Sequence, residues 1–271
     1  MIKETVAKII ITEGVKKGIP FVGKVMNKKK KVAFISDCNK KSNFPGFRKV
    51  YVPMKRATLS TETEREDTIK RLKIFRYEEL GAKHDSRLTI RSSGLPVTAG
   101  FIIGYSLHTR DNIELIYETQ EGFYKNISSE IIGFKKEVID ERENCEDAID
   151  LCFYIQAKNQ DIGSSVFQNY IQNSDLNPYI VSLVNTQEYS INLNLEKTAT
   201  SLTKVINEYY GKLEKEYSKK INIHLFYNGI FELALSIGNQ LSPTVPVQLY
   251  DYGAKETVYR SSFQLHGELF N

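Results

Sequence analysis

IGNQLSPTVPVQLYDY, residues 237–252, joins the end of a predicted helix to a predicted strand through a Ser-Pro turn. An earlier stretch, IGYSLHTRDNIELIYE at residues 103–118, has the same order of helix end, polar turn and strand. Their glycines, Gly104 and Gly238, lie 134 residues apart. This repeat predicts two similar units related by a pseudo-two-fold axis. The alternative is coincidence, because any two Rossmann-like units share a rhythm of helix, turn and strand.

The second half of the chain alternates short apolar runs with helical patterns, which is typical of a parallel α/β sheet. Strands are predicted at 148–156, 179–184, 221–226, 247–251 and 257–265. Helices are predicted at 162–171 and 196–220, and a third helix follows the turn at 227–229 and ends near 240.

The first half repeats much of this order. Strands are predicted at 31–38, 49–53, 87–91 and 113–119, a hairpin partner at 122–127, and helices at 62–80 and 95–108. Thr61 and Glu64 have capping-box spacing at the start of the helix 62–80. Between Cys38 and Lys49 the sequence predicts a loop where the second half has a helix.

The predicted fold class is therefore α/β, with two pseudo-symmetric Rossmann-like units of mainly parallel strands fused in one chain. The units are placed at 31–134 and 148–271, with the charged stretch 135–147 as the connection between them. Residues 1–30 are not assigned to either unit.

Composition bounds the classes of function. The chain has 271 residues, of which 41% are hydrophobic and 26% charged, with a net charge of +4 and three cysteines without CxxC spacing. No apolar stretch is long enough for a membrane span or a signal peptide. We expect a cytoplasmic protein with reduced thiols. The mild positive charge permits an anionic ligand without requiring duplex nucleic acid, and it also fits a role in solubility alone.

The loops after the predicted strands are the candidate binding site, because ligands of open parallel sheets bind at the carboxyl ends of the strands. Amides and carboxylates there can contact base edges, and lysine or arginine can contact phosphates. Tyr227 and Phe44 are candidates for stacking on a base. The alternative is that polar residues follow strands in every soluble protein. The predicted ligand-binding residues are Asp37, Asn39, Lys40, Arg91, Ser92, Ser93, Gln156, Lys158, Asn159, Gln160, Tyr227 and Asn228.

The segment IHLFYNGIFELALSIGNQLSPTVPVQLYDY, residues 223–252, closely resembles SAVED domains: a strand, a small-residue turn, an Ala- and Leu-rich helix ending in Gly-x-x-Leu, and a strand reading Val-Gln-Leu-Tyr-acid. The earlier GLPVTAGFIIGYSLHTRDNIELIYE resembles the matching part of the family's first half, with Pro96 eight residues before Gly104. The second copy departs from this pattern, with Ile230 at the proline position. The resemblance covers roughly residues 30–265.

The resemblance implies two fused CARF-like units that sense cyclic oligonucleotides, either cyclic trinucleotides or cyclic tetra-adenylate, in antiphage defence of the CBASS or type III CRISPR kind. It also implies homo-oligomerisation on ligand binding, which activates an effector. No effector motif is found in the sequence, so a separate effector protein is expected. The N-terminal segment with Lys28–Lys31 could contact that partner, although a lysine run also fits a solvated loop.

No catalytic or metal-binding constellation is predicted, and no cofactor is expected. The four histidines lack metal-ligand spacing, and no phosphate-binding glycine motif or nucleophile elbow occurs. One alternative is a ring nuclease that cleaves the cyclic ligand, for which Lys158, Arg91 or His224 could serve. Another alternative is a scaffold subunit without a ligand.

Overall fold

The computed structural model describes residues 30–36, 44–54, 61–80, 88–108, 113–119, 122–125, 131–140, 148–158, 163–186, 194–253 and 257–270. The predictions for residues 1–29 lie outside this part. Among the helices described, none combines the length and the apolar character needed to cross a bilayer.

The first unit is a five-stranded sheet with the order β2-β1-β3-β4-β5. Strands β1 to β4 are parallel, and β5 pairs with β4 in the predicted antiparallel hairpin. The elements are β1 (Lys30–Ser36), β2 (Arg48–Val52), α2 (Glu62–Leu80), β3 (Leu88–Ser93), α3 (Val97–Ser106), β4 (Ile113–Thr119) and β5 (Gly122–Lys125).

The second unit is a six-stranded sheet with the order β11-β10-β9-β7-β8-β6. Strands β7 to β10 are parallel, and β6 and β11 are antiparallel edge strands. The elements are β6 (Phe134–Asp140), β7 (Ala148–Gln156), α4 (Ser164–Gln172), β8 (Pro178–Asn185), α5 (Leu195–Glu216), β9 (Lys220–Asn228), α6 (Phe231–Gln240), β10 (Val247–Gly253) and β11 (Val258–Leu265).

The predicted repeat is confirmed by the topology. The order β2-β1-β3-β4-β5 of the first sheet recurs as β8-β7-β9-β10-β11 in the second. Helices α3 and α6 have both of their bounds 134 residues apart, and so do strands β4 and β10. The two Tyr-acid pairs are not equivalent, because Tyr117–Glu118 lies one position beyond Tyr250–Asp251 in this register.

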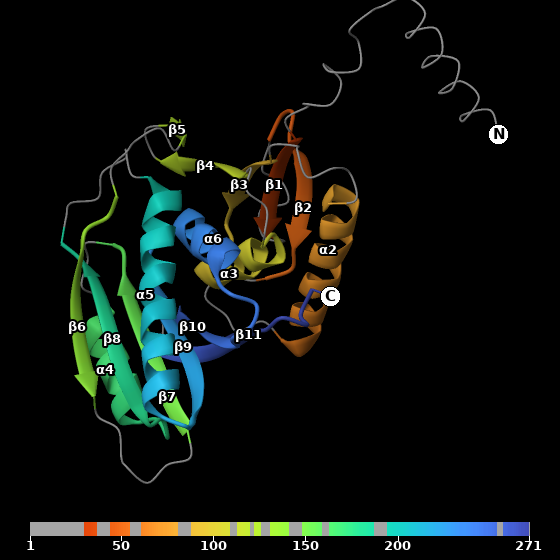
Figure 1. The fold of residues 1–271 in the computed structure, drawn as a ribbon. Helices are drawn as coiled ribbons and strands as arrows, with labels where there is room; N and C mark the ends of the chain where they lie inside the picture. Colours follow the sequence, from red (N-terminus) through yellow and green to blue (C-terminus); the bar gives the residue numbers. More distant parts are fainter. Residues whose placement is uncertain are drawn as a thin grey trace, which may run out of the picture.

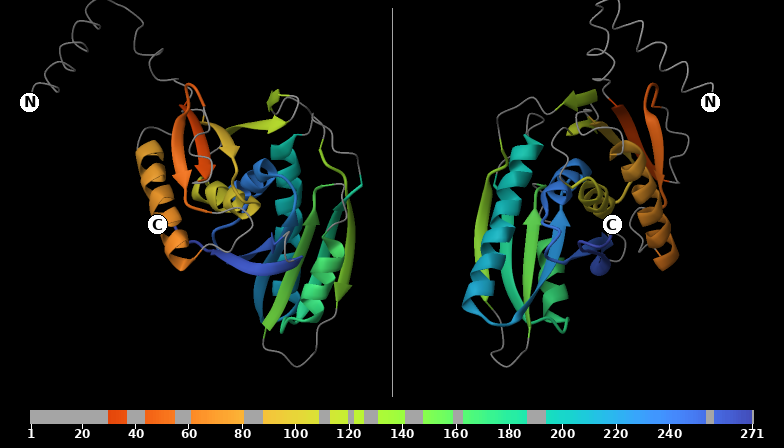
Figure 2. Two further views of the ribbon diagram at one scale, coloured as in Figure 1. Left: turned by 180° about the vertical axis from the view of Figure 1, so that it is seen from behind. Right: turned by 45° about the vertical axis from the view of Figure 1, so that its right-hand side comes forward.

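Helices α3 and α6 form the layer between the two sheets (Figures 1 and 2). One hydrophobic core runs through this layer, from Phe34 in the first sheet to Phe153 in the second. Helix α5 covers the same face of the second sheet, where Tyr209 contacts Phe153. Helix α4 covers the opposite face, where Phe167 stacks on Tyr154. The alternation of side chains along β7 thus separates an inner and an outer face.

The contact between α3 and α6 is made through glycine. A Cβ atom on Gly104 would lie 2.8 Å from the backbone nitrogen of Asn239, and one on Gly238 would lie 2.8 Å from the Cα of Phe101. Phe101 and Leu235 occupy equivalent positions in the two helices, so the contact is reciprocal. Small residues allow the two backbones to approach closely, which explains why the same glycine occurs in both copies.

The predicted capping box at the start of α2 is confirmed. The backbone N–H of Glu64 donates to the Thr61 hydroxyl at 3.2 Å, and the N–H of Thr61 donates to the Glu64 carboxylate at 3.0 Å. Arg65 of this helix donates to the Ser262 carbonyl at 2.7 Å, which links α2 to the second unit.

The segment expected to connect the units is partly a strand. Residues 134–140 form β6, which pairs with β8 along its whole length. Its charged side chains are tolerated because an edge strand is largely exposed and charges discourage further pairing. The rest of that connection, residues 141–147, lies outside the described residues.

We predict that Gly104→Ala and Gly238→Ala each lower the free energy of unfolding by about 1–3 kcal/mol, because the added methyl group forces apart two packed helices. Urea unfolding measures this change. Gly211→Ala in α5 is the matched control, since a Cβ there meets no atom within 4 Å. In the control, alanine should stabilise the helix by about 0.5–1 kcal/mol. Equal effects at all three positions would contradict the role given to the crossing.

Candidate binding site at the strand ends

Helices α3 and α6 run in the same direction past each other. Gly100 lies near Phe231 and Ala234, Gly104 lies near Leu235, and the ring nitrogen Nδ1 of His108 lies 3.0 Å from the Asn239 carbonyl oxygen. Their N-termini therefore lie at the same end, beside the carboxyl ends of β3 and β9, which precede them. Neither helix has a side-chain cap at its N-terminus. Two positive dipole ends placed together favour an anion nearby.

A polar contact joins the two units at this end. The Ser92 hydroxyl donates to the Glu232 carboxylate at 3.3 Å, from the end of β3 to the first turn of α6. Burial raises the pKa of Glu232, and the hydrogen bonds from Ser92 and from its own backbone amide offset this only in part. Ser92 was predicted from the sequence, whereas Glu232 was not, because its burial depends on the packing of two distant segments.

Arg91 belongs to a stacked pair in the first unit. Its guanidinium lies over the Phe44 ring, 4.1 Å from the centroid, a cation–π geometry. Phe44 is 5% exposed and packs on Ala33 and Ile35, so the structure assigns this ring to the core and not to stacking on a base. Arg91 is half-buried at the end of β3.

Gln156, Lys158 and Asn228 come together in the second unit. The backbone N–H groups of Ala157 and Lys158 both donate to the Asn228 carbonyl oxygen, at 2.8 and 3.2 Å. Gln156 is buried, and its side-chain oxygen accepts a hydrogen bond from the Tyr154 hydroxyl at 3.1 Å. Lys158 is exposed. The carboxyl ends of β7 and β9 thus present the exposed cation of Lys158 and the half-buried amide of Asn228, while the amide of Gln156 is buried.

The structure places Tyr227 in the core, unlike the predicted stacking position. Its side chain is 5% exposed, its ring packs edge-on against Phe101 with centroids 5.2 Å apart, and its hydroxyl donates to the Ile230 carbonyl oxygen. The reason is strand alternation: Phe226 and Asn228 point to the outer face of the sheet, so Tyr227 points to the inner face against α3.

The remaining predicted residues are not placed. Asp37, Asn39, Lys40, Asn159 and Gln160 lie outside the described residues. Ser93 ends β3, and its side chain is not described.

A group that the sequence reasoning missed surrounds Gly163, the N-cap residue of α4. A Cβ on Gly163 would lie 2.7 Å from the Tyr154 hydroxyl and 3.3 Å from both the Asn228 side-chain nitrogen and the Tyr259 hydroxyl. Only Asn228 was predicted. The tyrosines looked like ordinary strand residues, since nothing local shows that β7 and β11 reach the same helix end.

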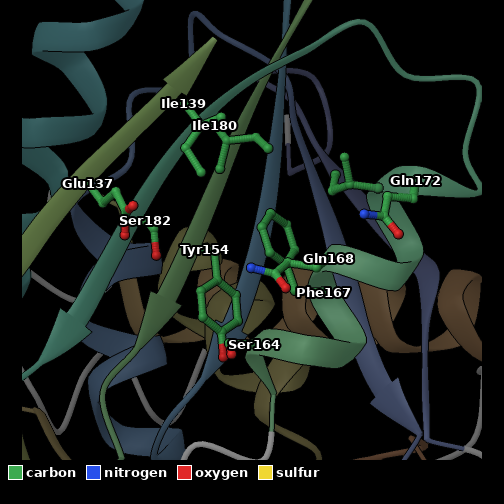
Figure 3. Close-up of a pocket in the computed structure, with 10 residues that line it drawn as sticks. Glu137, Ile139, Tyr154, Ser164, Phe167, Gln168, Gln172, Ile180 and Ser182 are labelled. Atoms are coloured by element: carbon green, nitrogen blue, oxygen red, sulfur yellow. The ribbon is translucent and has the colours of Figure 1, made fainter. Parts of the chain in front are cut away.

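A pocket of about 290 Å³ lies beside this group, between α4 and strands β6 to β8 (Figure 3). The Tyr154 hydroxyl and Ser164 lie together at one end, and Glu137 lies across the pocket beside Ser182. The other lining residues are Ile139, Phe167, Gln168, Ile171, Gln172 and Ile180. The pocket therefore reaches from the N-terminus of α4 along the outer face of the sheet.

His224 lies on the same outer face, closer to the amino ends of the strands. Its ring nitrogens are 2.8 Å from the Tyr250 hydroxyl and 2.9 Å from the Asp150 carboxylate. Burial would raise the pKa of Asp150, but hydrogen bonds from His224 and from Asn177 and Asn222 lower it. Both nitrogens are engaged in the structure, which gives His224 a structural role. Within the described ranges, no three His, Cys, Asp or Glu side chains come together as metal ligands.

These observations define a class of protein: two Rossmann-like units fused about a pseudo-two-fold axis, with their strand ends gathered at one end of a shared helix pair. Residues 74–265 match the SAVED family, described as the SMODS-associated and fused to various effectors sensor domain. The chain belongs to the SAVED family.

Solved structures of SAVED/CARF-domain containing receptors share this fold. The Acinetobacter baumannii Cap4 receptor with the cyclic trinucleotide 2'3'3'-cAAA has a TM-score of 0.57 at 16% identity, covering 88% of this chain and 52% of that chain. The same receptor with 3'3'3'-cAAA gives 0.58 at 15% identity, again with 88% and 52% covered. The Moraxella osloensis Cap4 receptor gives 0.53 at 14% identity, with 88% and 50% covered.

The present chain spans about half the length of these receptors. A search of curated protein sequences found no match.

Asp251, near the carboxyl end of β10, gives a pH-dependent prediction. Burial raises its pKa to about 6, and the hydrogen bond donated by Ser262 at 2.7 Å offsets this only in part. A raised carboxyl pKa stabilises the fold below the unfolded value of about 4, and this contribution is lost as the pH rises through 6. We expect the free energy of unfolding to fall by up to about 3 kcal/mol across this window.

Urea unfolding between pH 4 and 8 measures that change, and Asp251→Asn should flatten the profile. The exposed Asp175→Asn serves as the control and should leave the profile as it is in the wild type. Asp150 acts in a different range, because its lowered pKa stabilises the fold above about pH 4 and this contribution is lost on further acidification. An unchanged profile in Asp251→Asn contradicts the assignment.

Proposed function

We propose that this chain is a sensor of cyclic oligonucleotides in antiphage defence, with a cyclic tri- or tetra-adenylate type of ligand. The observation that carries the proposal is the parallel α3–α6 pair in a SAVED family chain, which gathers the strand ends of both units and two uncapped helix N-termini at one end. A cyclic ligand with repeated nucleotides offers similar groups to two similar units. The Acinetobacter baumannii Cap4 receptor structures hold cyclic trinucleotides, and this supports the same class of ligand for the present chain.

The chemistry at the strand ends suits such a ligand. Arg91 and Lys158 bring one cation from each unit, and these can meet phosphates. Asn228 can donate to a phosphate or a base edge. Glu232, half-buried beside Ser92, can accept a hydrogen bond from an exocyclic amino group of a base.

The signal passes to a separate effector protein in this proposal, through assembly of several copies when the ligand binds. Ligand that bridges two units changes the surface they present to another copy. The competing functions are a scaffold subunit that binds no ligand and a nuclease that cleaves the cyclic oligonucleotide. The experiments below distinguish them from the sensor.

Calorimetric titration against 2'3'3'-cAAA, 3'3'3'-cAAA and cyclic tetra-adenylate is expected to show saturable binding of one ring. Lys158→Ala should weaken it by about fivefold to tenfold, since one charge-assisted contact is lost. Lys215→Ala is the matched control, because this exposed lysine lies in the last turn of α5, next to the amino end of β9.

The control should bind like the wild type, and absence of heat with every cyclic oligonucleotide would contradict the proposal. Chromatography of the same samples should show the cyclic ligand intact. A linear product would identify a ring nuclease instead.

We further expect the mass measured by light scattering to increase when the binding ring is added, because ligand-driven assembly is part of the proposal. A non-binding ring is the control and should leave the mass unchanged. Binding without any mass increase would retain the sensor and reject assembly of this chain alone as its output.

A further inference from the structure

The N-terminus of α4 has the features of an anion-binding helix end. The helix has nine residues and follows the carboxyl end of β7, and its N-cap residue is Gly163, which provides no side-chain cap. The first-turn amides and the helix dipole there favour negative charge. A helix end alone does not define a site, but a second feature is present.

The Tyr259 hydroxyl points at this helix end without a partner. Tyr259 is 3% exposed, and within the described residues its hydroxyl has no hydrogen-bond partner. The oxygen lies 3.3 Å from the position of a Cβ on Gly163. Its ring is held edge-on against Phe226, with centroids 5.2 Å apart. A buried hydroxyl without a partner is costly, so its retention calls for an explanation.

One further donor reaches the same point. The Asn228 side-chain nitrogen lies 3.3 Å from the same Cβ position, whereas the Tyr154 hydroxyl, 2.7 Å from it, already donates its hydrogen to Gln156. The hydroxyl of Tyr259, the amide and the backbone N–H groups together form a set of hydrogen-bond donors without a cation. Oxyanion sites at helix N-termini are often built in this way.

The pocket beside α4 reaches Ser164, the first residue of the helix. It is lined by Tyr154 and Ser164, which lie together in Figure 3, while the carboxylate of Glu137 lies on the other side. An anion is therefore favoured at the Ser164 end and disfavoured at the Glu137 end.

We propose that the N-terminus of α4, with the hydroxyl of Tyr259 and the amide of Asn228, is a subsite for a phosphate oxyanion, in which Tyr259 supplies the unpaired donor. The proposal rests on the proposed function in that the phosphate is a phosphodiester of the cyclic ligand. A free phosphate has the same chemistry, so the experiment uses both sources.

The test compares wild type, Tyr259→Phe and Tyr105→Phe. Tyr105 is the matched control, because its hydroxyl is also buried and without a partner among the described residues, yet it lies in α3 beside Phe270. Both variants remove one unpaired hydroxyl and keep the ring, so both should retain or raise the melting temperature.

Binding of inorganic phosphate is followed by thermal shift, and binding of 3'3'3'-cAAA by calorimetry. We expect Tyr259→Phe to weaken binding about tenfold, and Tyr105→Phe to leave it unchanged. Asn228→Asp, which adds a charge at the same point and keeps the backbone, should abolish binding.

Equal affinity of wild type and Tyr259→Phe for every probe that binds overturns the subsite and leaves the sensor proposal standing. Phosphate binding that depends on Tyr259, together with no binding of any ring, keeps the subsite and removes the sensor proposal. Binding of neither probe to the wild type overturns the subsite.

Discussion

The close crossing of α3 and α6 is the constraint on which the rest of the molecule depends. Gly104 and Gly238 let the two backbones touch, and the reciprocity of their contacts with Leu235 and Phe101 gives the pair its pseudo-two-fold symmetry. Because the helices run in the same direction, the carboxyl ends of both sheets lie at one end of the pair. A larger residue at either glycine would move one sheet relative to the other, so packing in the core and geometry at the strand ends are set by the same contact.

The two units differ on their outer faces. In the second unit, Phe167 of α4 packs edge-on against Phe226, with centroids 4.9 Å apart. In the first unit, Phe44 and Arg91 form the corresponding pair, with the ring supplied by the segment after β1 and the cation by β3. An aromatic pair is thus replaced by a cation on an aromatic ring. The symmetry of the core therefore supports an asymmetric site, in which one unit presents a guanidinium and the other presents a helix end.

Much of the fold could be predicted from the sequence, because periodicity, turn residues and capping are local. The bounds of α2 and β4, the capping box of Thr61 and the hairpin of β4 with β5 depend on neighbours in the chain. The sheet face on which a residue at a strand end lies is harder to predict from the sequence. Tyr227 was expected to contact the ligand, but side chains alternate between the two faces of the sheet, and its side chain lies in the core.

Charged edge strands such as β6 also resemble linkers in sequence, since neither face is apolar. Gly163, Tyr154 and Tyr259 could not be grouped at all from the sequence, since their proximity depends on β7, α4 and β11 packing together.

The tyrosines on this outer face differ in their hydrogen bonding. The Tyr250 hydroxyl is hydrogen-bonded to His224, whose other ring nitrogen lies 2.9 Å from the Asp150 carboxylate, so no ligand is needed to pair this hydroxyl. Tyr259 is buried to a similar degree, but its hydroxyl has no such partner in the part of the chain that the structure describes. Burial and its tyrosine neighbours raise the pKa of this hydroxyl and so keep it protonated. A protonated hydroxyl can donate to an anion, and its position at an uncapped helix end favours ligand binding over a role in core packing alone.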